Sequence, residues 1–346
     1  MTVRVAMVGL GAAAKTIHLP AFRKVDEVEV VGGFDPASSA EGVRQFATLE
    51  ELIERGKPDI LAIATPPAYH LDIARAVLAA GCHVFCEKPL ANSLEEADEM
   101  RRLAKAANRH IVVNSEFPYM PIHLAAKAEI GSDNFGNLRF LDIRQSFYVS
   151  ADTEAGWRGR DMQRTFKEFG THVLDLCKFF FGERPKRMRP KMPRAGDAAG
   201  PDYLCIVELE FSGDRHALIV LDRLTRGRHR YLDIRLVGDH STVETSIGGR
   251  LQVAGGLRTS TKRPFIDLDF AMGGNARRYR GENYDTIARA PIDLFADATA
   301  RLFHAFLDAL KSGGTPPNDI DEARHTLALL YGAYEAAKSG ETHNIA

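Results

Sequence analysis

The sequence has 346 residues, of which 45% are hydrophobic and 26% charged, a profile typical of a globular protein long enough for two domains. Its formal net charge of -1 gives no general attraction to nucleic acid or to anionic membranes. The chain has no apolar run of about 18 residues and no apolar leader before the first strand, so we predict neither a membrane span nor a signal peptide. The four cysteines form no C-x-x-C pair, and a reducing cytoplasm is the expected location.

The first third of the chain alternates predicted strands with predicted helices. Short apolar runs that end at Gly or Pro are typical of buried parallel strands, and apolar residues three or four positions apart are typical of helices. On these patterns we predict strands at 3–8, 27–35, 59–67, 84–86 and 110–114. We predict helices at 13–24, 49–56, 69–81 and after Ser93, which forms a capping box with Glu96. Such alternation gives a doubly wound parallel sheet, so residues 1–116 are expected to form an α/β Rossmann domain that binds NAD(P).

The pattern changes after residue 116. Strands with partial alternation are predicted at 137–149, 202–211, 215–223 and 231–238, and helices at 294–311 and 321–338. In the second of these strands one face carries Cys205, Val207, Leu209 and Phe211, and the opposite face carries Glu208 and Glu210. Residues 117–346 are therefore expected to form an α+β domain for substrate binding and oligomerisation, with a large, mainly antiparallel open sheet. We expect the Gly- and Arg-rich residues 255–293 to be loop.

The stretch GLGAAA fits the pattern G-x-G-x-x-A between the first strand and the first helix. Gly9 permits a tight turn, Gly11 lets a diphosphate approach the backbone, and Ala14 lets the helix pack on the strand. A diphosphate there would accept hydrogen bonds from the free N–H groups at the helix start. The cofactor-binding candidates in this stretch are Gly9, Leu10, Gly11, Ala12, Ala13 and Ala14. Because Gly-rich turns after strands are common, a purely structural turn is the alternative.

Asp35 ends the second predicted strand, about 20 residues after the glycine motif. A carboxylate there suits hydrogen bonds from the adenosine ribose and repels the 2′-phosphate of NADP. Residues 36–43 contain no Arg or Lys that could bind such a phosphate. We therefore expect NAD as the cofactor in preference to NADP. A solvated aspartate in a turn is the alternative.

The charged pair Glu87–Lys88 follows an apolar strand and precedes Pro89, in the stretch VFCEKPLANS. Ligands bind at the strand ends of an open α/β sheet, so this pair is expected beside the nicotinamide. For a lone lysine at the end of a strand, a solvated cap is the alternative.

Several stretches occur in an order and spacing that resemble one protein family. They are GLGAAA, ATPPAYH (64–70), CEKPLANS (86–93), VVNSEF (112–117), EFGTHVLDL (168–176) and the C-terminal stretch from FLDALKSGG onward. The set resembles the Gfo/Idh/MocA oxidoreductases, which include glucose–fructose oxidoreductase and inositol dehydrogenase, over essentially the whole chain. No single motif is decisive, but the ordered set is specific. The resemblance implies a Rossmann domain, a second domain with an open sheet, NAD(P) in the cleft, and redox chemistry on sugars or polyols.

The resemblance also implies roles for single residues. The lysine of the family's E-K-P motif is catalytic and corresponds to Lys88, and its Asp-x-x-x-His pair corresponds to Glu168 and His172. Glu168 departs from the family's aspartate, QRTFKEF replaces a glycine-rich approach to this helix, and NSEF lacks the usual following arginine, so we expect a shifted substrate preference. The cofactor contacts expected on this basis are Thr65, Pro66, Pro67, His70 and Asn114, and Trp157 and Arg158 match a cofactor or substrate contact of the family. The expected substrate contacts are Lys88, Glu168 and His172, together with Tyr119, near which we expect substrate specificity to be set.

The chemistry of alcohol oxidation supports the roles that the resemblance implies for these side chains. Oxidising an alcohol removes the O–H proton and a hydride, which calls for a base near neutral pKa and a cation beside the developing alkoxide. We predict His172 as general base and Lys88 as electrostatic stabiliser and proton relay. Glu168 lies four positions from His172 on one helix face and is expected to orient the imidazole or accept a substrate hydroxyl. Glu87 is expected to bind the nicotinamide ribose, and the Lys88–Pro89 bond is expected to be cis.

Structural alternatives stay open for several of these residues. A mid-helix histidine such as His172 is often merely packed, and His70 fits support of the cofactor loop and packing at a helix start equally well. The basic stretches 185–196 and 223–230 fit a solvated strand face and a loop, or else attraction of an anionic substrate or a subunit contact. The remaining histidines lack metal-ligand spacing, so we predict no metal.

The leading functional hypothesis is an NAD-dependent dehydrogenase acting on a sugar, cyclic polyol or sugar acid. A second enzyme hypothesis uses a tightly held NAD transiently for elimination or glycoside cleavage. A third is a nucleotide- or sugar-sensing regulator without turnover. Because an open sheet with an uncovered apolar face needs a partner, we expect a homodimer or homotetramer through that face, and no nucleic-acid or membrane partner.

Overall fold

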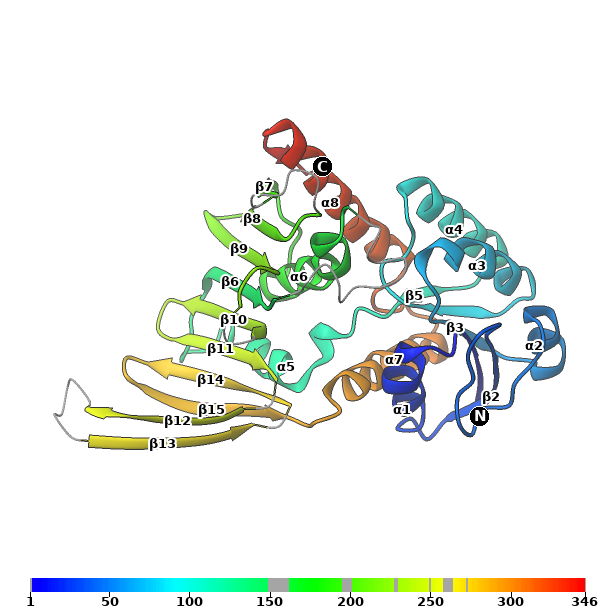
Figure 1. Ribbon diagram of the computed structural model, residues 1–346, viewed down its shortest axis with the longest axis horizontal. Helices are drawn as coiled ribbons and strands as arrows, with labels where there is room; N and C mark the ends of the chain where they lie inside the picture. The colour runs from blue at the N-terminus through cyan, green and yellow to red at the C-terminus, as the bar shows by residue number, and fades with distance from the viewer. Residues whose placement is uncertain are drawn as a thin grey trace. The chain divides into compact units, whose positions relative to one another are not determined.

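The computed structural model describes residues 2–148, 162–194, 201–226, 230–248, 250–257, 264–271 and 273–345 (Figure 1). The chain packs into two compact units, of which the first contains Met1–Tyr119 and Phe295–Ala328 and the second contains Met120–Leu294 and Leu329–Ala346. No motif of the sequence indicates the return of residues 295–328 to the first unit. None of the helices in the described part of the chain combines the length and the apolar character that crossing a bilayer requires.

A parallel sheet forms the centre of the first unit. Its five strands lie in the order β2-β1-β3-β4-β5, with bounds β1 Val3–Val8, β2 Val28–Phe34, β3 Ile60–Ile63, β4 His83–Cys86 and β5 Ile111–Val113. All four residues of β3 are fully buried, because a parallel sheet is covered on both faces. The predicted doubly wound sheet is thus confirmed. Its strand order changes direction between β1 and β3, the position at which such sheets bind ligands.

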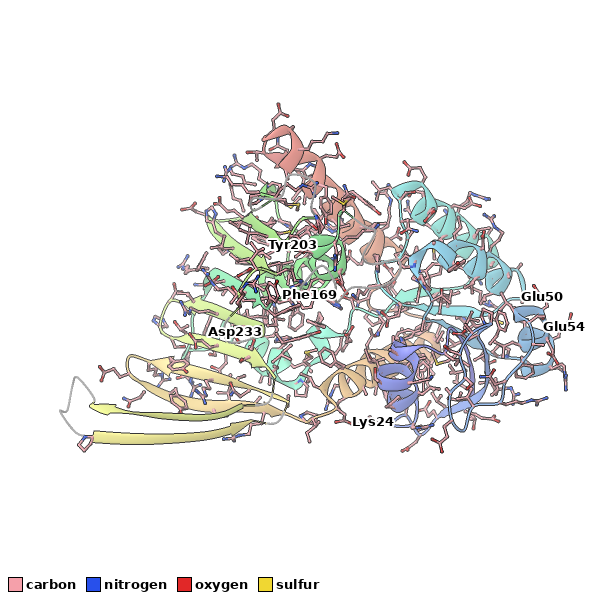
Figure 2. The ribbon with its side chains drawn as sticks, in the orientation of Figure 1. Lys24, Glu50, Glu54, Phe169, Tyr203 and Asp233 are labelled. Atoms are coloured by element: carbon pink, nitrogen blue, oxygen red, sulfur yellow. The ribbon has the colours of Figure 1, made fainter. Side chains whose placement is uncertain are left out.

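Helices follow the strands of the first unit. The first covers residues 12–22 and contains a π-helical turn, η1 Ala14–His18, before α1 Leu19–Phe22. The others are α2 Leu49–Gly56, η2 Pro67–Tyr69, α3 His70–Ala79, α4 Leu94–Ala107, η3 Phe117–Tyr119 and α7 Leu294–Ser312, while α8 Ile320–Ser339 begins in the first unit and ends in the second. Glu50 and Glu54 lie on the exposed side of α2, away from the sheet (Figure 2).

The predicted start of α4 is confirmed. Ser93 Oγ accepts a hydrogen bond from the Glu96 backbone N–H at 3.2 Å, and Glu96 Oε2 accepts one from Asn92 N at 2.9 Å. This is a capping box whose second bond reaches one residue further back than usual. Thr48 caps α2 in the same way, through Glu51 N at 3.1 Å. Local sequence therefore fixes where these helices begin.

An aromatic cluster joins α7 to the Rossmann sheet. The ring of Phe303 lies 4.8 Å from that of Phe22 and 5.1 Å from that of Phe85, and Phe306 packs beside it at 6.1 Å. Each of these rings is at most 1% exposed. Full burial of one such side chain stabilises a fold by about 1.5–3 kcal/mol. The cluster explains why this late segment of the chain belongs to the first unit.

A large sheet dominates the second unit, in the order β15-β14-β11-β10-β6-β9-β8-β7-β16. Its strands are β6 Leu138–Ser146, β7 Arg187–Lys191, β8 Leu204–Phe211, β9 Arg215–Asp222, β10 Arg230–Gly238, β11 Thr242–Ile247, β14 Gly274–Arg280, β15 Asn283–Ala290 and β16 His343–Asn344. Neighbours are antiparallel except β6 and β9, so the predicted, mainly antiparallel sheet is confirmed. The helices α5 Pro121–Glu129 and α6 Thr165–Phe181 pack against it.

Side chains of β8 alternate as predicted. The buried set, at most 2% exposed, consists of Cys205, Val207, Leu209 and Phe211. The residues between them are half-buried, and β9 shows the same alternation. We define the open face of the sheet by four half-buried apolar residues, namely Leu204, Ile206, Leu218 and Val220. This row alternates with the core residues and so lies on the opposite side of the sheet.

The expectation of loop at 255–293 is wrong. Described parts of this region form β14, β15 and a hairpin of β12 Arg250–Leu257 with β13 Pro264–Ala271. The cause is visible on β14, where Arg277 is only 7% exposed and its guanidinium stacks 4.5 Å from the Tyr284 ring. Long charged side chains can pack along their stems, so these strands carry weak apolar alternation although they pair normally.

Candidate active site

The glycine motif occupies the turn between β1 and the first helix. Gly9 has a φ of +88°, and a Cβ there would lie 2.5 Å from the Ala64 carbonyl oxygen, so only glycine fits. At Gly11, by contrast, an added Cβ would meet no heavy atom of the described residues within 4 Å. Ala14 is fully buried in the core. The three small residues thus make the tight turn, leave the helix start open and let the helix pack.

Asp35 lies directly beside this turn. Its Oδ2 accepts a hydrogen bond from Leu10 N at 2.7 Å, and its Oδ1 accepts from Ala37 N at 2.8 Å and Ser38 N at 2.9 Å. Three backbone donors therefore hold the carboxylate in the turn at the end of β2. Its expected contact with the adenosine ribose stays a prediction.

Glu87 is held by groups of the chain itself. Its Oε1 lies 2.7 Å from His18 Nε2 and accepts a hydrogen bond from Asn114 Nδ2 at 2.9 Å, while its Oε2 accepts one from Lys88 N at 3.2 Å. Burial raises the pKa of Glu87, but the hydrogen bonds and charges of His18, Asn114 and Lys88 outweigh it and lower the pKa to about 2. Glu87 is therefore an ionised anchor, and its expected contact with the nicotinamide ribose stays a prediction.

Lys88 follows directly at the carboxyl end of β4 and is half-buried. The Lys88–Pro89 peptide bond is cis, as predicted. Lys88 therefore lies at the edge of the sheet formed by the carboxyl ends of its strands.

His70 links two loops at the same edge. It is fully buried, with Nε2 3.0 Å from Thr65 O, and Nδ1 3.1 Å from Leu90 O and 3.3 Å from Cys86 Sγ. Burial lowers its pKa against the opposing effect of these carbonyls. These contacts fit support of the loops after β3 and β4. A direct contact of His70 with the cofactor stays a prediction.

Two further candidates of the first unit have defined surroundings. Asn114 is 1% exposed, and its Oδ1 accepts a hydrogen bond from Thr299 Oγ1 at 3.2 Å. Tyr119 packs against the core of the first unit, and burial raises its pKa to about 12. His18 and Thr299 carried no signal in the sequence, because a lone histidine or threonine on a helix is uninformative until its partner is known.

The first unit gathers most of the predicted cofactor residues at one edge of its sheet. The glycine motif, Asp35, Thr65, the Glu87–Lys88 pair and Asn114 follow the carboxyl ends of five adjacent parallel strands. Pro66 and Pro67 continue the loop after β3. Within the described ranges, no three His, Cys, Asp or Glu side chains gather in a way that could hold a metal ion.

Glu168 and His172 lie on α6 in the second unit, four positions apart on one helix face. Asp202 caps this helix from a distant part of the chain, accepting hydrogen bonds from Arg164 N at 2.6 Å and Thr165 N at 2.8 Å. His172 is 4% exposed, and its ring lies 5.4 Å from that of Phe169. Phe169 in turn meets Tyr231 edge-on at 5.8 Å. Figure 2 shows Phe169 among the side chains around α6.

Arg223 is a buried cation in the same unit. It is 5% exposed, donates to Gln145 Oε1 at 2.6 Å and stacks 4.0 Å above the Phe147 ring. Burial lowers its pKa, and Glu168 is the strongest of the charges that raise it. The loop considered for residues 223–230 is present at Arg223, but the expectation that it is solvated is wrong there. Sequence reasoning missed this residue because basic residues in polar stretches are usually exposed.

Lys88 and His172 belong to different units, and their meeting over one nicotinamide stays a prediction. Trp157 and Arg158, two predicted cofactor contacts, lie outside the described residues.

Comparison with known proteins agrees with these features. Residues 3–115 match a family described as "Oxidoreductase family, NAD-binding Rossmann fold", and residues 123–244 match the "GFO/IDH/MocA C-terminal domain". D-apiose dehydrogenase of Paraburkholderia graminis is 24% identical over 97% of this chain and 88% of its own length. Levoglucosan dehydrogenase of Pseudarthrobacter phenanthrenivorans is 24% identical over 83% of this chain and 81% of its own.

Solved structures share the fold. A crystal structure of an Agrobacterium radiobacter oxidoreductase with NAD+, L-tartaric acid and magnesium matches with a TM-score of 0.79 and 17% identity, over 100% of this chain and 99% of that one. The aldose-aldose oxidoreductase of Caulobacter crescentus matches with a TM-score of 0.77 and 18% identity, over 99% and 100%. The chain belongs to the Gfo/Idh/MocA family of oxidoreductases with an NAD-binding Rossmann fold.

Proposed function

We propose that the protein is an NAD-dependent dehydrogenase that moves a hydride between a carbinol carbon of a sugar, cyclic polyol or sugar acid and the nicotinamide. The observation that carries this proposal is the shared edge of the Rossmann sheet. There the glycine motif, a fixed Asp35 and the Glu87–Lys88 pair follow adjacent strands. The names of the apiose and levoglucosan dehydrogenases support a carbohydrate substrate.

The residues at this edge fit a dinucleotide. Backbone N–H groups of Gly11–Ala13 at the open helix start would bind the diphosphate, and Asp35 would accept the adenosine ribose hydroxyls. Thr65 Oγ1 is buried and has no hydrogen-bond partner among the residues that the structure describes, so it is free to bond a nicotinamide group. Bound NAD supplies the hydride acceptor. Because Asp35 carries a negative charge there, we propose NAD as the cofactor in preference to NADP.

The protein's own side chains would handle the proton. The Lys88 ammonium would stabilise the substrate oxygen as it loses its proton, and the His172 imidazole would accept that proton. Glu168, within the electrostatic reach of buried Arg223, would accept a neighbouring substrate hydroxyl and so orient the sugar. This scheme requires α6 of the second unit to reach the nicotinamide end of the first.

The open face supports a further proposal, namely association of the protein with itself. Four half-buried apolar residues lie on the side of the sheet away from the core, and an apolar row of this kind is usually covered by a partner. We propose a homodimer or homotetramer through this face. The four cysteines, all free and buried, also support a reducing, cytoplasmic location.

The test combines two measurements on one set of variants. Reduced-cofactor formation is followed by absorbance over a panel of sugars, inositols and sugar acids, and NAD binding is followed by fluorescence titration. Lys88→Met should bind NAD normally but lose turnover, whereas Lys105→Met, at an exposed lysine of α4, should retain both. Normal turnover by Lys88→Met would contradict the assignment. Product formation without net NADH would favour transient oxidation, and NAD binding without any turnover would favour a regulator.

A further inference from the structure

A buried histidine connects the cofactor helix to the strand that carries Lys88. His18 is fully buried, and its Nε2 lies 2.7 Å from Glu87 Oε1. It sits in the helix that begins at the glycine motif, whereas Glu87 ends β4. The pair therefore joins two parts of the Rossmann unit that are far apart in sequence.

The helix has an irregular turn at the position of His18. His18 is the last residue of the π-helical turn Ala14–His18. A π-helical turn adds a residue to the helix and changes the direction of the side chains that follow, and such turns are frequent at functional sites. The imidazole is then fixed by packing, with ring centroids 5.8 Å from Phe85 and 5.9 Å from Phe22.

Both carboxylate oxygens of Glu87 accept hydrogen bonds, and each oxygen connects Glu87 to a different part of the unit. One oxygen also accepts from Asn114 Nδ2 at 2.9 Å, and Asn114 Oδ1 accepts from Thr299 Oγ1 at 3.2 Å. The other oxygen accepts from the backbone N–H of Lys88 at 3.2 Å. A single hydrogen-bonded chain thus runs from His18 to α7, and the backbone of Lys88 is attached to it.

Among the partners of Glu87, His18 contributes most to stabilising its ionised form. The Glu87 side chain is only 15% exposed, so its charge needs partners inside the protein. Burial acts to raise the pKa of Glu87, and the contact with His18 is the largest effect that lowers it. Without His18, the Glu87 carboxylate would still accept hydrogen bonds from Asn114 Nδ2 and Lys88 N. It would lose the contact that contributes most to stabilising its ionised form.

We propose that His18 is a positioning residue of the dehydrogenase: it holds Glu87 in one orientation and thereby fixes Lys88 at the nicotinamide end of the site. Because the same helix begins at the glycine motif, the diphosphate-binding turn and the lysine share one rigid connection. The inference rests on the proposed function, since the placement of Lys88 matters for hydride transfer from an alcohol.

The decisive variants are His18→Leu, which removes the donor, and His18→Gln, whose amide nitrogen reaches the former position of Nε2. We expect His18→Leu to lower kcat about 100-fold while the NAD dissociation constant and the substrate KM change little. We expect His18→Gln to recover most of this loss. Thermal unfolding of both variants is measured alongside, because a merely structural role would lower stability and activity in parallel.

The pH profile supplies a second criterion. Removing His18 takes away the main effect that lowers the Glu87 pKa, so the acid limb of kcat should move to higher pH in His18→Leu and part of the way back in His18→Gln. Wild-type kcat and an unmoved acid limb in His18→Leu would overturn the proposal. If His18→Leu does not fold, His18→Gln and Glu87→Gln decide in a double-mutant cycle, in which additive effects on kcat would overturn it.

A readout independent of turnover separates this inference from the proposed function. Infrared difference spectra at mildly acidic pH detect a protonated carboxyl group, and loss of the band in the double variant with Glu87→Gln assigns it. We expect the band in His18→Leu and its absence in the wild type. If the wild type turns over no substrate, the proposed function fails, and the infrared result still decides whether His18 keeps Glu87 ionised. Identical spectra of the wild type and His18→Leu would overturn that role.

Discussion

The backbone N–H of Leu10 donates a hydrogen bond to Asp35 Oδ2 at 2.7 Å. This bond joins the glycine turn after β1 to the acid at the end of β2. The two elements proposed to bind the diphosphate and the adenosine ribose are therefore held together. If these groups bind the nucleotide as proposed, binding would require little ordering of them.

Asp35→Asn tests this arrangement. The change removes the negative charge, and a lost charge-assisted hydrogen bond of about 1.5 kcal/mol corresponds to about 10-fold weaker NAD binding. NADP should bind relatively better, because the repulsion of its 2′-phosphate disappears. Both dissociation constants are measured by fluorescence titration, with Asp26→Asn, at an exposed aspartate, as the matched control. An unchanged ratio of the two constants in Asp35→Asn would contradict a ribose-binding role.

The two glycines of the motif should respond differently to the same substitution. Gly9→Ala places a Cβ against the Ala64 carbonyl at a φ of +88°, so we expect a loss of at least about 2 kcal/mol in the free energy of unfolding. Gly11→Ala meets open space and should leave stability within about 0.5 kcal/mol. It should nevertheless weaken NAD binding, because the methyl group occupies the approach of the diphosphate. Urea unfolding and NAD titration of both variants separate the two effects, and equal stability losses would contradict the structural assignment.

Much of the first unit could be predicted because its signals are local. Short apolar runs alternating with helical patterns predicted the five strands, and the capping box at Ser93 predicted the start of α4. Parallel pairing then required the motifs at the strand ends to share one edge of the sheet. This is why the sequence alone predicts that the glycine motif, Asp35 and Lys88 lie at the same edge.

What could not be predicted depends on contacts between distant residues. Thr299 lies 185 positions from its partner Asn114, and Arg223 lies 78 positions from Gln145. Neither partner is recognisable from the residues around it. The strands β14 and β15 were missed for a related reason, since Arg277 packs over the ring of Tyr284 and does not mark a solvated loop.

Arg223 and Arg226 offer a matched pair for the second unit. Both stack on an aromatic ring, at 4.0 Å from Phe147 and 4.1 Å from Tyr148, but Arg223 is buried whereas Arg226 is exposed. Arg223→Met should lower the free energy of unfolding by about 3 kcal/mol, because Gln145 loses its donor and Glu168 loses its nearby cation. Arg226→Met should cost less than about 1 kcal/mol. Similar losses in urea unfolding would refute the difference in burial.

The low pKa of Glu87 predicts how stability depends on pH. Its folded-state pKa, about 2, lies below the value of 4.5 for an unperturbed glutamate, so the carboxylate stabilises the fold above pH 4.5 and this contribution disappears as the pH falls toward 2. The contribution is at most about 3 kcal/mol. Urea unfolding of the wild type and Glu87→Gln at pH values from 7 to 3 checks this, and we expect the two stabilities to converge on acidification. A constant difference between them would show that the charge of Glu87 is not involved.

Substitutions at two adjacent residues of β8 should affect self-association and folding separately. Ile206 is half-buried on the open face, opposite Val220 of β9, whereas Val207 is fully buried. Ile206→Lys should leave unfolding nearly unchanged but dissociate the proposed oligomer, because a charge cannot be buried in an apolar interface without a partner. Val207→Lys should instead prevent folding, since the charge would enter the core of the second unit. Light scattering and circular dichroism measure the two effects. A wild-type monomer at micromolar concentration would reject the interface, and an oligomer that persists in Ile206→Lys would place the contact on another surface.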